Sequence, residues 1–340
     1  MTANKNLKRR VRARAAKTGE SYTTALRHFR STAGGDRKVS AAKATRLAVA
    51  QTTLREDPRR IDELREAACE VRRLMLRAHD EGAKLAHFPE GATCSPHKLV
   101  MSIDGPNTVG PSDWDRFEWT VVCDELANTA ELAARLKLWT VLGSVHQLTP
   151  PTRPYNSLYV ISDQGVVVTR YDERLLSNTK ISYMYSPGAA PVTFDVDGFR
   201  FGCALGMEAH YPEVFGEYER LDVDCVLFSS TGEGKPGGAQ AFATEVQGHA
   251  TANSYWVSFS VGAQQSRIAS AGVVSPGGKW VARCPADGTA AIVVVDLDDD
   301  SAEIAAVLQH ARPWRRRARA GLYVPYFVRA DPRSDDRATF

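Results

Sequence analysis

The chain has 340 residues, a mass of 37.3 kDa and a formal net charge of +3. Its 43% hydrophobic and 24% charged residues are typical of a globular protein and exclude collagen-like and low-complexity classes. The apolar runs, such as residues 290–295, are too short to span a membrane, and residues 1–14 carry Lys and Arg instead of a signal peptide's apolar core. We expect a cytoplasmic protein with no membrane partner.

The positive charge is concentrated at the start of the chain. Residues 1–45 contain 12 Lys and Arg but only 2 Asp and Glu, so the remainder is mildly acidic. This asymmetry predicts a basic, partly helical arm over 1–45, a main domain over 46–325 and a C-terminal tail over 326–340. Because such arms attract polyanions, an acidic partner or nucleic acid is a candidate ligand for residues 1–45.

The main domain alternates apolar strand patterns with amphipathic helices. Expected strands lie at residues 46–53, 84–88, 139–145, 157–162, 166–171, 191–196, 199–205, 225–229, 256–261, 271–275, 280–282 and 290–297. Expected helices lie at 58–82, 114–136, 211–221 and 241–252. Asp197-Gly198 predicts a tight hairpin. Because strands often follow strands directly, the order favours a mixed, layered α/β sandwich over a barrel.

Several segments share one further pattern. They are "LAHFPEG", "YNSLYVISDQG", "PGAAPVTFDVDGFRFGCALGMEAHYPEVF", "SPGGKWVA" and "ARPWRRRAR". In order and spacing they resemble the nitrilase superfamily of carbon–nitrogen hydrolases, over roughly residues 46–325. The resemblance implies a four-layer α-β-β-α sandwich and a homodimer that acts on a small-molecule substrate.

The family's chemistry uses a Glu, a Lys and a Cys, with a second Glu near the Lys. The thiolate attacks a nitrile or amide carbon, the Glu transfers protons and the Lys stabilises the oxyanion. The resemblance implies that Glu90 is the general acid/base. However, Glu173 stands at the Lys position and Lys180 stands near the second Glu position, so the two charges are exchanged. We expect Lys180 to pair with Glu90 or Glu173 in one cleft.

The nucleophile position is also altered. In the run from Gly202 to Glu208, Gly206 takes the place of the family's cysteine, and glycine cannot form a thioester. Strand alternation should turn Cys203 toward the interior, so Cys94, near Glu90, is the only plausible substitute thiol. We expect Glu208 to orient backbone more than to attack.

The other cysteines show no metal-site spacing. Cys69, Cys123, Cys225 and Cys284 form no CxxC and no Cys/His zinc pattern, so we expect free thiols, no metal and no cofactor.

These residues support three functions. The first is a nitrilase-fold enzyme that acts on a small amide, amine or nitrile by altered, non-thioester chemistry. It would use Glu90, Glu173 and Lys180 as catalytic residues. The second is a catalytically silent scaffold that binds a ligand or partner. The third is a nucleic-acid-associated protein that acts through its arm. The expected substrate-binding residues are Cys94, Glu208, His210 and Ser230.

Overall fold

The structure is a computed structural model that describes residue 12 and residues 44–233, 238–298, 301–328 and 330–335. The predicted basic arm therefore lies outside the described residues except for Arg12, Ala44 and Thr45. The described residues from 44 onward belong to one compact unit. No helix in the described ranges is long and apolar enough to cross a membrane.

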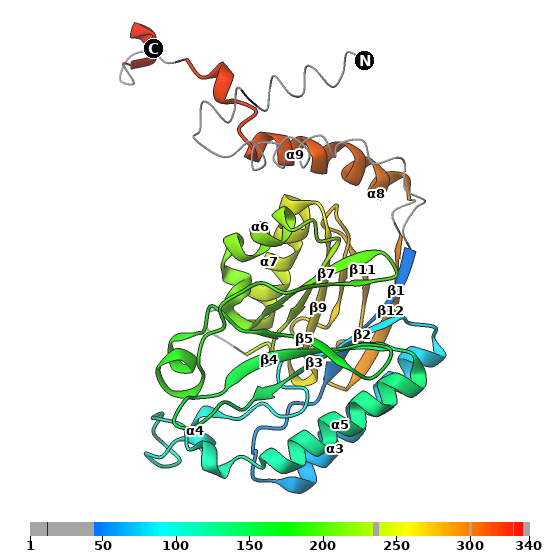
Figure 1. Cartoon of the computed structure of the whole chain (residues 1–340), viewed down its shortest axis with the longest axis vertical. Helices are drawn as coiled ribbons and strands as arrows, with labels where there is room; N and C mark the ends of the chain where they lie inside the picture. The colour runs from blue at the N-terminus through cyan, green and yellow to red at the C-terminus, as the bar shows by residue number, and fades with distance from the viewer. Residues whose placement is uncertain (1–11, 13–43, 234–237, 299–300, 329, 336–340) are drawn as a thin grey trace. The chain divides into compact units, whose positions relative to one another are not determined.

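Two sheets form the centre of the domain (Figure 1). The first contains, in spatial order, β5 (Val167–Asp172), β4 (Tyr155–Ile161), β3 (Trp139–His146), β2 (Leu85–His87), β1 (Ala44–Thr52) and β12 (Ala291–Asp298). The second contains β6 (Thr193–Val196), β7 (Phe199–Leu205), β8 (Cys225–Ser229), β9 (Trp256–Gly262), β10 (Gly272–Val274) and β11 (Trp280–Arg283). They join where the ends of β1 and β9 pair, through Gln51–Val261 and Thr52–Gly262.

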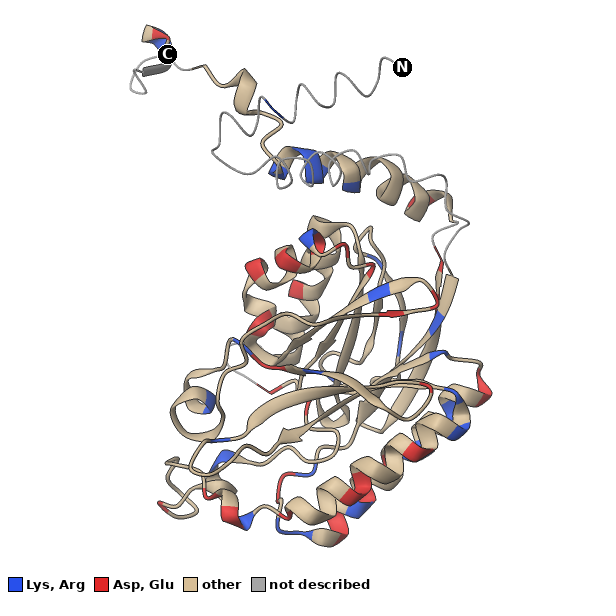
Figure 2. Cartoon of the chain, in the orientation of Figure 1, with Lys and Arg blue, Asp and Glu red and all other residues tan. Residues whose placement is uncertain are grey.

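Helices cover the outer faces of both sheets. The long helices α3 (Ile61–Asp80) and α5 (Trp119–Leu136) pack on the first sheet, and α6 (Pro212–Arg220) and α7 (Gly238–Asn253) pack on the second (Figure 1). The predicted four-layer α-β-β-α fold is confirmed. Figure 2 shows acidic and basic residues interspersed along α3 and α5, as expected for amphipathic helices with one face in water.

The alternation of side chains along β1 explains the layering. Leu47 and Val49 belong to the core between the sheets, whereas Ala48 and Ala50 belong to the cluster under α3 and α5. All four are at most 1% exposed. A strand buried on both faces reads as a continuous apolar run, which is why the sequence predicted it clearly.

Shorter elements make up the rest of the secondary structure in the described ranges. They are α4 (Lys98–Met101), η1 (Trp114–Arg116), η2 (Lys180–Met184), η3 (Gly206–His210), η4 (Ala263–Gln265), α8 (Ala302–Ala306), η5 (Val307–Ala311), α9 (Arg312–Arg319), η6 (Val324–Tyr326) and α10 (Pro332–Asp335). The predicted hairpin is confirmed, and its turn residues Asp197 and Gly198 have φ of +49° and +81°. The sequence did not predict the C-terminal helices, nor that β12 pairs antiparallel with β1 in the first sheet while β10 and β11 lie in the second.

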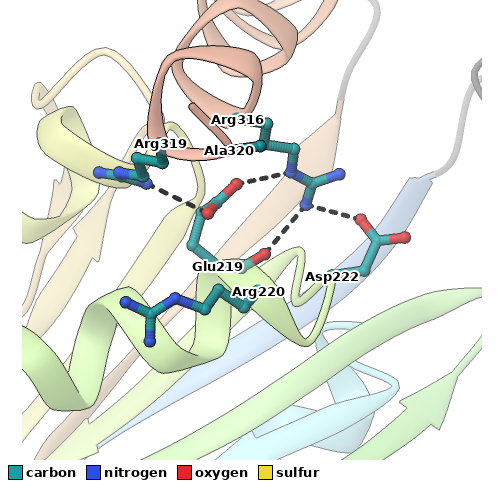
Figure 3. A pocket seen from close by; sticks show the side chains of 6 residues that line it. All are labelled: Glu219, Arg220, Asp222, Arg316, Arg319 and Ala320. Atoms are coloured by element: carbon teal, nitrogen blue, oxygen red, sulfur yellow. Dashed lines mark hydrogen bonds and ion pairs between the residues drawn. The ribbon is translucent and has the colours of Figure 1, made fainter. Parts of the chain in front are cut away.

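Arginines fasten α9 to the end of α6. Arg316 Nε lies 2.6 Å from Glu219 Oε1 and its Nη2 lies 2.8 Å from Asp222 Oδ1, while Arg319 Nη1 lies 3.2 Å from Glu219 Oε2. These residues line a surface pocket of about 420 Å³ together with Arg220, whose side chain makes none of the interactions drawn in Figure 3. Because its charged side chains are largely paired between α9 and the end of α6, we interpret this pocket as part of the contact between the two helices.

Candidate active site

Glu90 lies just beyond the carboxyl end of β2, where Phe88-Pro89 leads the chain out of the first sheet. It is 5% exposed, and both of its oxygens are occupied. Oε1 accepts hydrogen bonds from Lys180 Nζ at 2.5 Å and from Asn156 Nδ2 at 2.9 Å. Oε2 accepts one from the backbone N–H of Thr231 at 3.1 Å. Glu90 is therefore held by groups from three different segments.

The exchanged charges meet at this carboxylate. Glu173, which follows β5, is 1% exposed and accepts hydrogen bonds at Oε2 from Lys180 Nζ at 2.7 Å and from Asn156 Nδ2 at 2.5 Å. Lys180 opens the wide turn η2 and bridges the two glutamates. The predicted pairing of Lys180 is confirmed, and we call Glu90, Glu173, Lys180 and Asn156 the ion cluster.

Burial and charge act in opposite directions in the ion cluster. Burial raises the pKa of Glu173 from its ordinary value of 4.5 to about 7, although the Lys180 ammonium lowers it. Burial alone would lower the pKa of Lys180, but the two facing carboxylates outweigh it and raise that pKa above its ordinary value. Lys180 thus stays charged at neutral pH, and Glu173 can exchange a proton there.

The raised pKa of Glu173 predicts a pH-dependent stability. The folded protein binds a proton at Glu173 more tightly than the unfolded chain does, so this contribution is complete below about pH 4.5 and is lost as the pH rises through about 7. In urea unfolding, the contribution of Glu173 to the free energy of unfolding should fall as the pH rises from 4.5 to 7.5. Glu173→Gln, which cannot titrate, should flatten that component, and an unchanged slope would contradict the assignment.

Gly206, at the end of β7, lies directly against the ion cluster. Its φ is +55°, a conformation that L-residues with a side chain rarely adopt. A Cβ added there would stand 2.5 Å from Glu173 Oε1 and 3.0 Å from Lys180 Nζ. Glu173 Oε1 itself is buried and has no hydrogen-bond partner among the described residues. The Glu173 carboxylate therefore occupies the space that a nucleophilic side chain would need.

Glu208 holds the turn that contains Gly206. Its Oε2 accepts from the Leu205 N–H at 2.8 Å and from Tyr171 Oη at 2.7 Å, and its Oε1 accepts from the Arg174 N–H at 2.7 Å. It is fully buried. These contacts confirm the expected backbone role and tie η3 to the loop that carries Glu173. Its expected contact with substrate stays a prediction.

The two cysteines nearest the site are buried. Cys203 faces the core between the sheets at 0% exposure, as alternation predicted. Cys94 is 1% exposed and packs with Leu64, Phe117, Val145 and other apolar side chains. Burial raises the pKa of both thiols well above the ordinary value, which disfavours the thiolate that a nucleophile needs. The geometry therefore disfavours Cys94 as a substitute nucleophile.

A thiol-labelling experiment should separate the cysteines into two groups. Only Cys69 and Cys123 are exposed; Cys94, Cys203, Cys225 and Cys284 are buried. We expect a maleimide to label two thiols per chain in the native protein and six after denaturation, counted by intact mass and assigned by peptide mapping. Rapid native labelling of Cys94 would show that its thiol is accessible and reopen its candidacy.

The remaining predicted site residues lie apart from these contacts. His210 Nδ1 pairs with Glu245 Oε1 on α7 at 2.6 Å, and the buried Ser230 Oγ accepts from the Gly232 N–H at 2.9 Å. Their substrate contacts stay predictions. Sequence reasoning missed Asn156, which bridges both glutamates from β4. Its only signal in the sequence was the polar pair Asn156-Ser157 near the start of a largely apolar strand.

Comparison with known proteins decides the family. A family model described as carbon-nitrogen hydrolase matches residues 42–306, which is most of the chain. The chain belongs to the carbon–nitrogen hydrolase family. No group of three or more His, Cys, Asp or Glu side chains in the described ranges is arranged to hold a metal.

Solved structures of the nitrilase superfamily share its fold. An amidase from Nesterenkonia AN1 matches with a TM-score of 0.63 and 16% identity, over 85% of this chain and 100% of the amidase. Nit3 from Saccharomyces cerevisiae, from branch 10 of the superfamily, matches with a TM-score of 0.60 and 20% identity, over 80% of this chain and 95% of Nit3. At these identities the likeness shows the fold alone, so the departures at residues 173, 180 and 206 must be interpreted from this chain's own geometry.

Proposed function

We propose that this carbon–nitrogen hydrolase-family protein acts on a small amide, amine or nitrile without a thioester intermediate, with Glu90 as general acid/base. One observation carries the proposal. The ion cluster keeps an ammonium between two carboxylates even though the positions of Lys and Glu are exchanged. Simple loss of an active site would not be expected to preserve this pairing. The missing sulfur at Gly206 removes only the covalent step.

In this proposal water replaces the thiol in the first step. For an amide, the water oxygen bonds to the carbonyl carbon while Glu90 accepts the water proton. Glu90 then returns that proton to the departing nitrogen as the carbon–nitrogen bond breaks, giving an acid and ammonia or an amine. Lys180 would stabilise charge that develops on the oxygen. Asn156 and the Thr231 N–H keep the Glu90 oxygens in place.

The test is ammonia release from a panel of short amides and nitriles by the purified full chain. We expect slow release that Glu90→Gln reduces by about 10²–10⁴-fold, the usual contribution of a general acid/base. Glu303→Gln, at the surface ion pair with Lys279, is the matched control and should not change the rate. Thermal unfolding of each variant shows whether a lost activity reflects a lost fold.

A different outcome would favour a catalytically silent scaffold. One observation supports that alternative, because Lys180 already contacts both carboxylates and Glu90 has three protein partners. Ligand-induced thermal stabilisation without any ammonia release would contradict the enzymatic proposal and support the scaffold. Homodimerisation and a ligand for residues 1–45 stay predictions.

A further inference from the structure

A buried histidine stands between the two sheets directly beneath Glu90. His87 is the last residue of β2, and on this strand Leu85 faces the second sheet, so His87 faces it too. It is 0% exposed, as are Ser229 on β8 and Ser258 on β9. Its ring nitrogens lie 2.9 Å from Ser258 Oγ (Nδ1) and 2.8 Å from Ser229 Oγ (Nε2). Both ring nitrogens of His87 are therefore hydrogen-bonded at a buried position where apolar side chains are usual.

The direction of each hydrogen bond in this series follows from its last acceptor, the backbone carbonyl of Phe88. Ser229 Oγ lies 2.9 Å from the backbone carbonyl of Phe88, which can only accept, so the Ser229 hydroxyl donates there. Ser229 must then accept from His87, which places the ring proton on Nε2. Nδ1 is left to accept from Ser258. Burial lowers the pKa of His87 from 6.5 to about 3, which agrees with a neutral ring at all working pH values.

This series of hydrogen bonds ends at Phe88, two residues before Glu90 in the sequence. The Phe88 N–H donates to Val141 O on β3 at 2.9 Å, while the Phe88 carbonyl accepts from Ser229. Phe88 is thus tied to both sheets, and Pro89 then fixes its own φ. The Phe88 hydrogen bonds and the fixed φ of Pro89 therefore restrict the backbone conformation of the two residues that precede Glu90.

The same serine also leads to the second oxygen of Glu90. Ser229 ends β8, and two residues later the Thr231 N–H donates to Glu90 Oε2. We infer that His87 is a positioning residue for Glu90, acting through Ser229 on both the backbone that leads into Glu90 and the strand end that binds its carboxylate. The inference rests on the acid/base role proposed for Glu90.

Ser229→Ala and a matched control test the inference without depending on turnover. Ser260→Ala is a close control, because Ser260 is also 0% exposed and pairs with Ser229 across β8 and β9, but its hydroxyl donates to the Ala50 carbonyl instead of the Phe88 carbonyl. Amide hydrogen exchange of Thr231 should accelerate about tenfold more in Ser229→Ala than in Ser260→Ala, as expected for local loosening. Equal acceleration in the two variants would overturn the inference.

Substitutions of His87 supply the second arm. His87→Gln keeps an N–H donor near the Nε2 position and should keep Thr231 exchange close to that of the unaltered protein, whereas His87→Phe should resemble Ser229→Ala. Nitrogen-15 spectra should show His87 as the Nε2–H tautomer. An Nδ1–H tautomer, or full protection in His87→Phe, would contradict the hydrogen-bond chain.

Turnover then separates this inference from the proposed function. If ammonia release is measurable, Ser229→Ala should lower kcat about tenfold with little change in KM, while Ser260→Ala should not. Changed exchange without turnover in any variant would refute the proposed activity and leave the positioning role intact. Turnover with equal kcat in both serine variants would refute the positioning role alone.

Discussion

Replacing Lys180 with methionine is expected to lower the free energy of unfolding by about 3–5 kcal/mol at neutral pH, the usual result of removing one partner from a buried ion pair. The substitution leaves the Glu90 and Glu173 carboxylates facing one another, at 5% and 1% exposure, with only the Asn156 amide between them. Urea unfolding measures the loss, and the protein should regain part of it at low pH, where the Glu173 carboxylate, whose pKa burial raises, becomes protonated.

Two further variants make this prediction specific. Lys279→Met breaks an ion pair with Glu303 whose side chains are 69% and 60% exposed, so it should change the stability by no more than about 1 kcal/mol. Exchanging both charges, Glu173→Lys with Lys180→Glu, keeps one ammonium among two carboxylates and should recover most of the loss. Equal effects of Lys180→Met and Lys279→Met would show that the ion cluster does not stabilise the fold.

Replacing Gly206 with alanine should also be strongly destabilising, by about 3 kcal/mol, because backbone strain and a steric overlap add. The left-handed φ of +55° penalises any side chain, and the new Cβ would lie 2.5 Å from Glu173 Oε1. Gly206→Cys should suffer the same overlap. It should therefore gain no amidase activity, since its sulfur cannot enter without displacing the Glu173 carboxylate.

Gly198→Ala isolates the steric term. Gly198 also has a positive φ, +81°, but a Cβ there meets nothing within 4 Å. It should lose only the strain energy, about 1 kcal/mol. Combining Gly206→Ala with Glu173→Ala should cost less than the sum of the two single changes, because the second removes the overlapping oxygen. Additive losses, or equal losses at Gly198 and Gly206, would contradict the overlap.

The sequence predicted the layers because the burial of strands and helices produces recognisable patterns of apolar residues. The doubly buried β1 reads as a continuous apolar run, α3 carries a single apolar stripe, and Asp197-Gly198 marks its turn. Pairing between strands that are distant in the sequence produces no such pattern. The sequence therefore placed β12 among the last strands but did not show that it pairs with β1 in the first sheet.

The site was predicted in part for the same reason. Motif order identified Glu90, Glu173, Lys180 and Gly206, and their contacts confirmed that the exchanged charges pair. Asn156 was missed because its role depends on where β4 places an amide in space. The fit of the Glu173 carboxylate against Gly206 likewise depends on backbone conformation that residue types do not specify.

The most direct test of the absence of a thioester nucleophile is covalent labelling with fluoroacetamide. In a mutant of the amidase from Nesterenkonia sp. AN1, the acetamide moiety of this compound adds covalently to the active-site cysteine. With the exposed Cys69 and Cys123 replaced by serine, the native protein should show no acetamide adduct by intact mass, because Gly206 offers no sulfur and the other thiols are buried. An adduct mapped to Cys94 or Cys203 would contradict the account and identify that cysteine as the nucleophile.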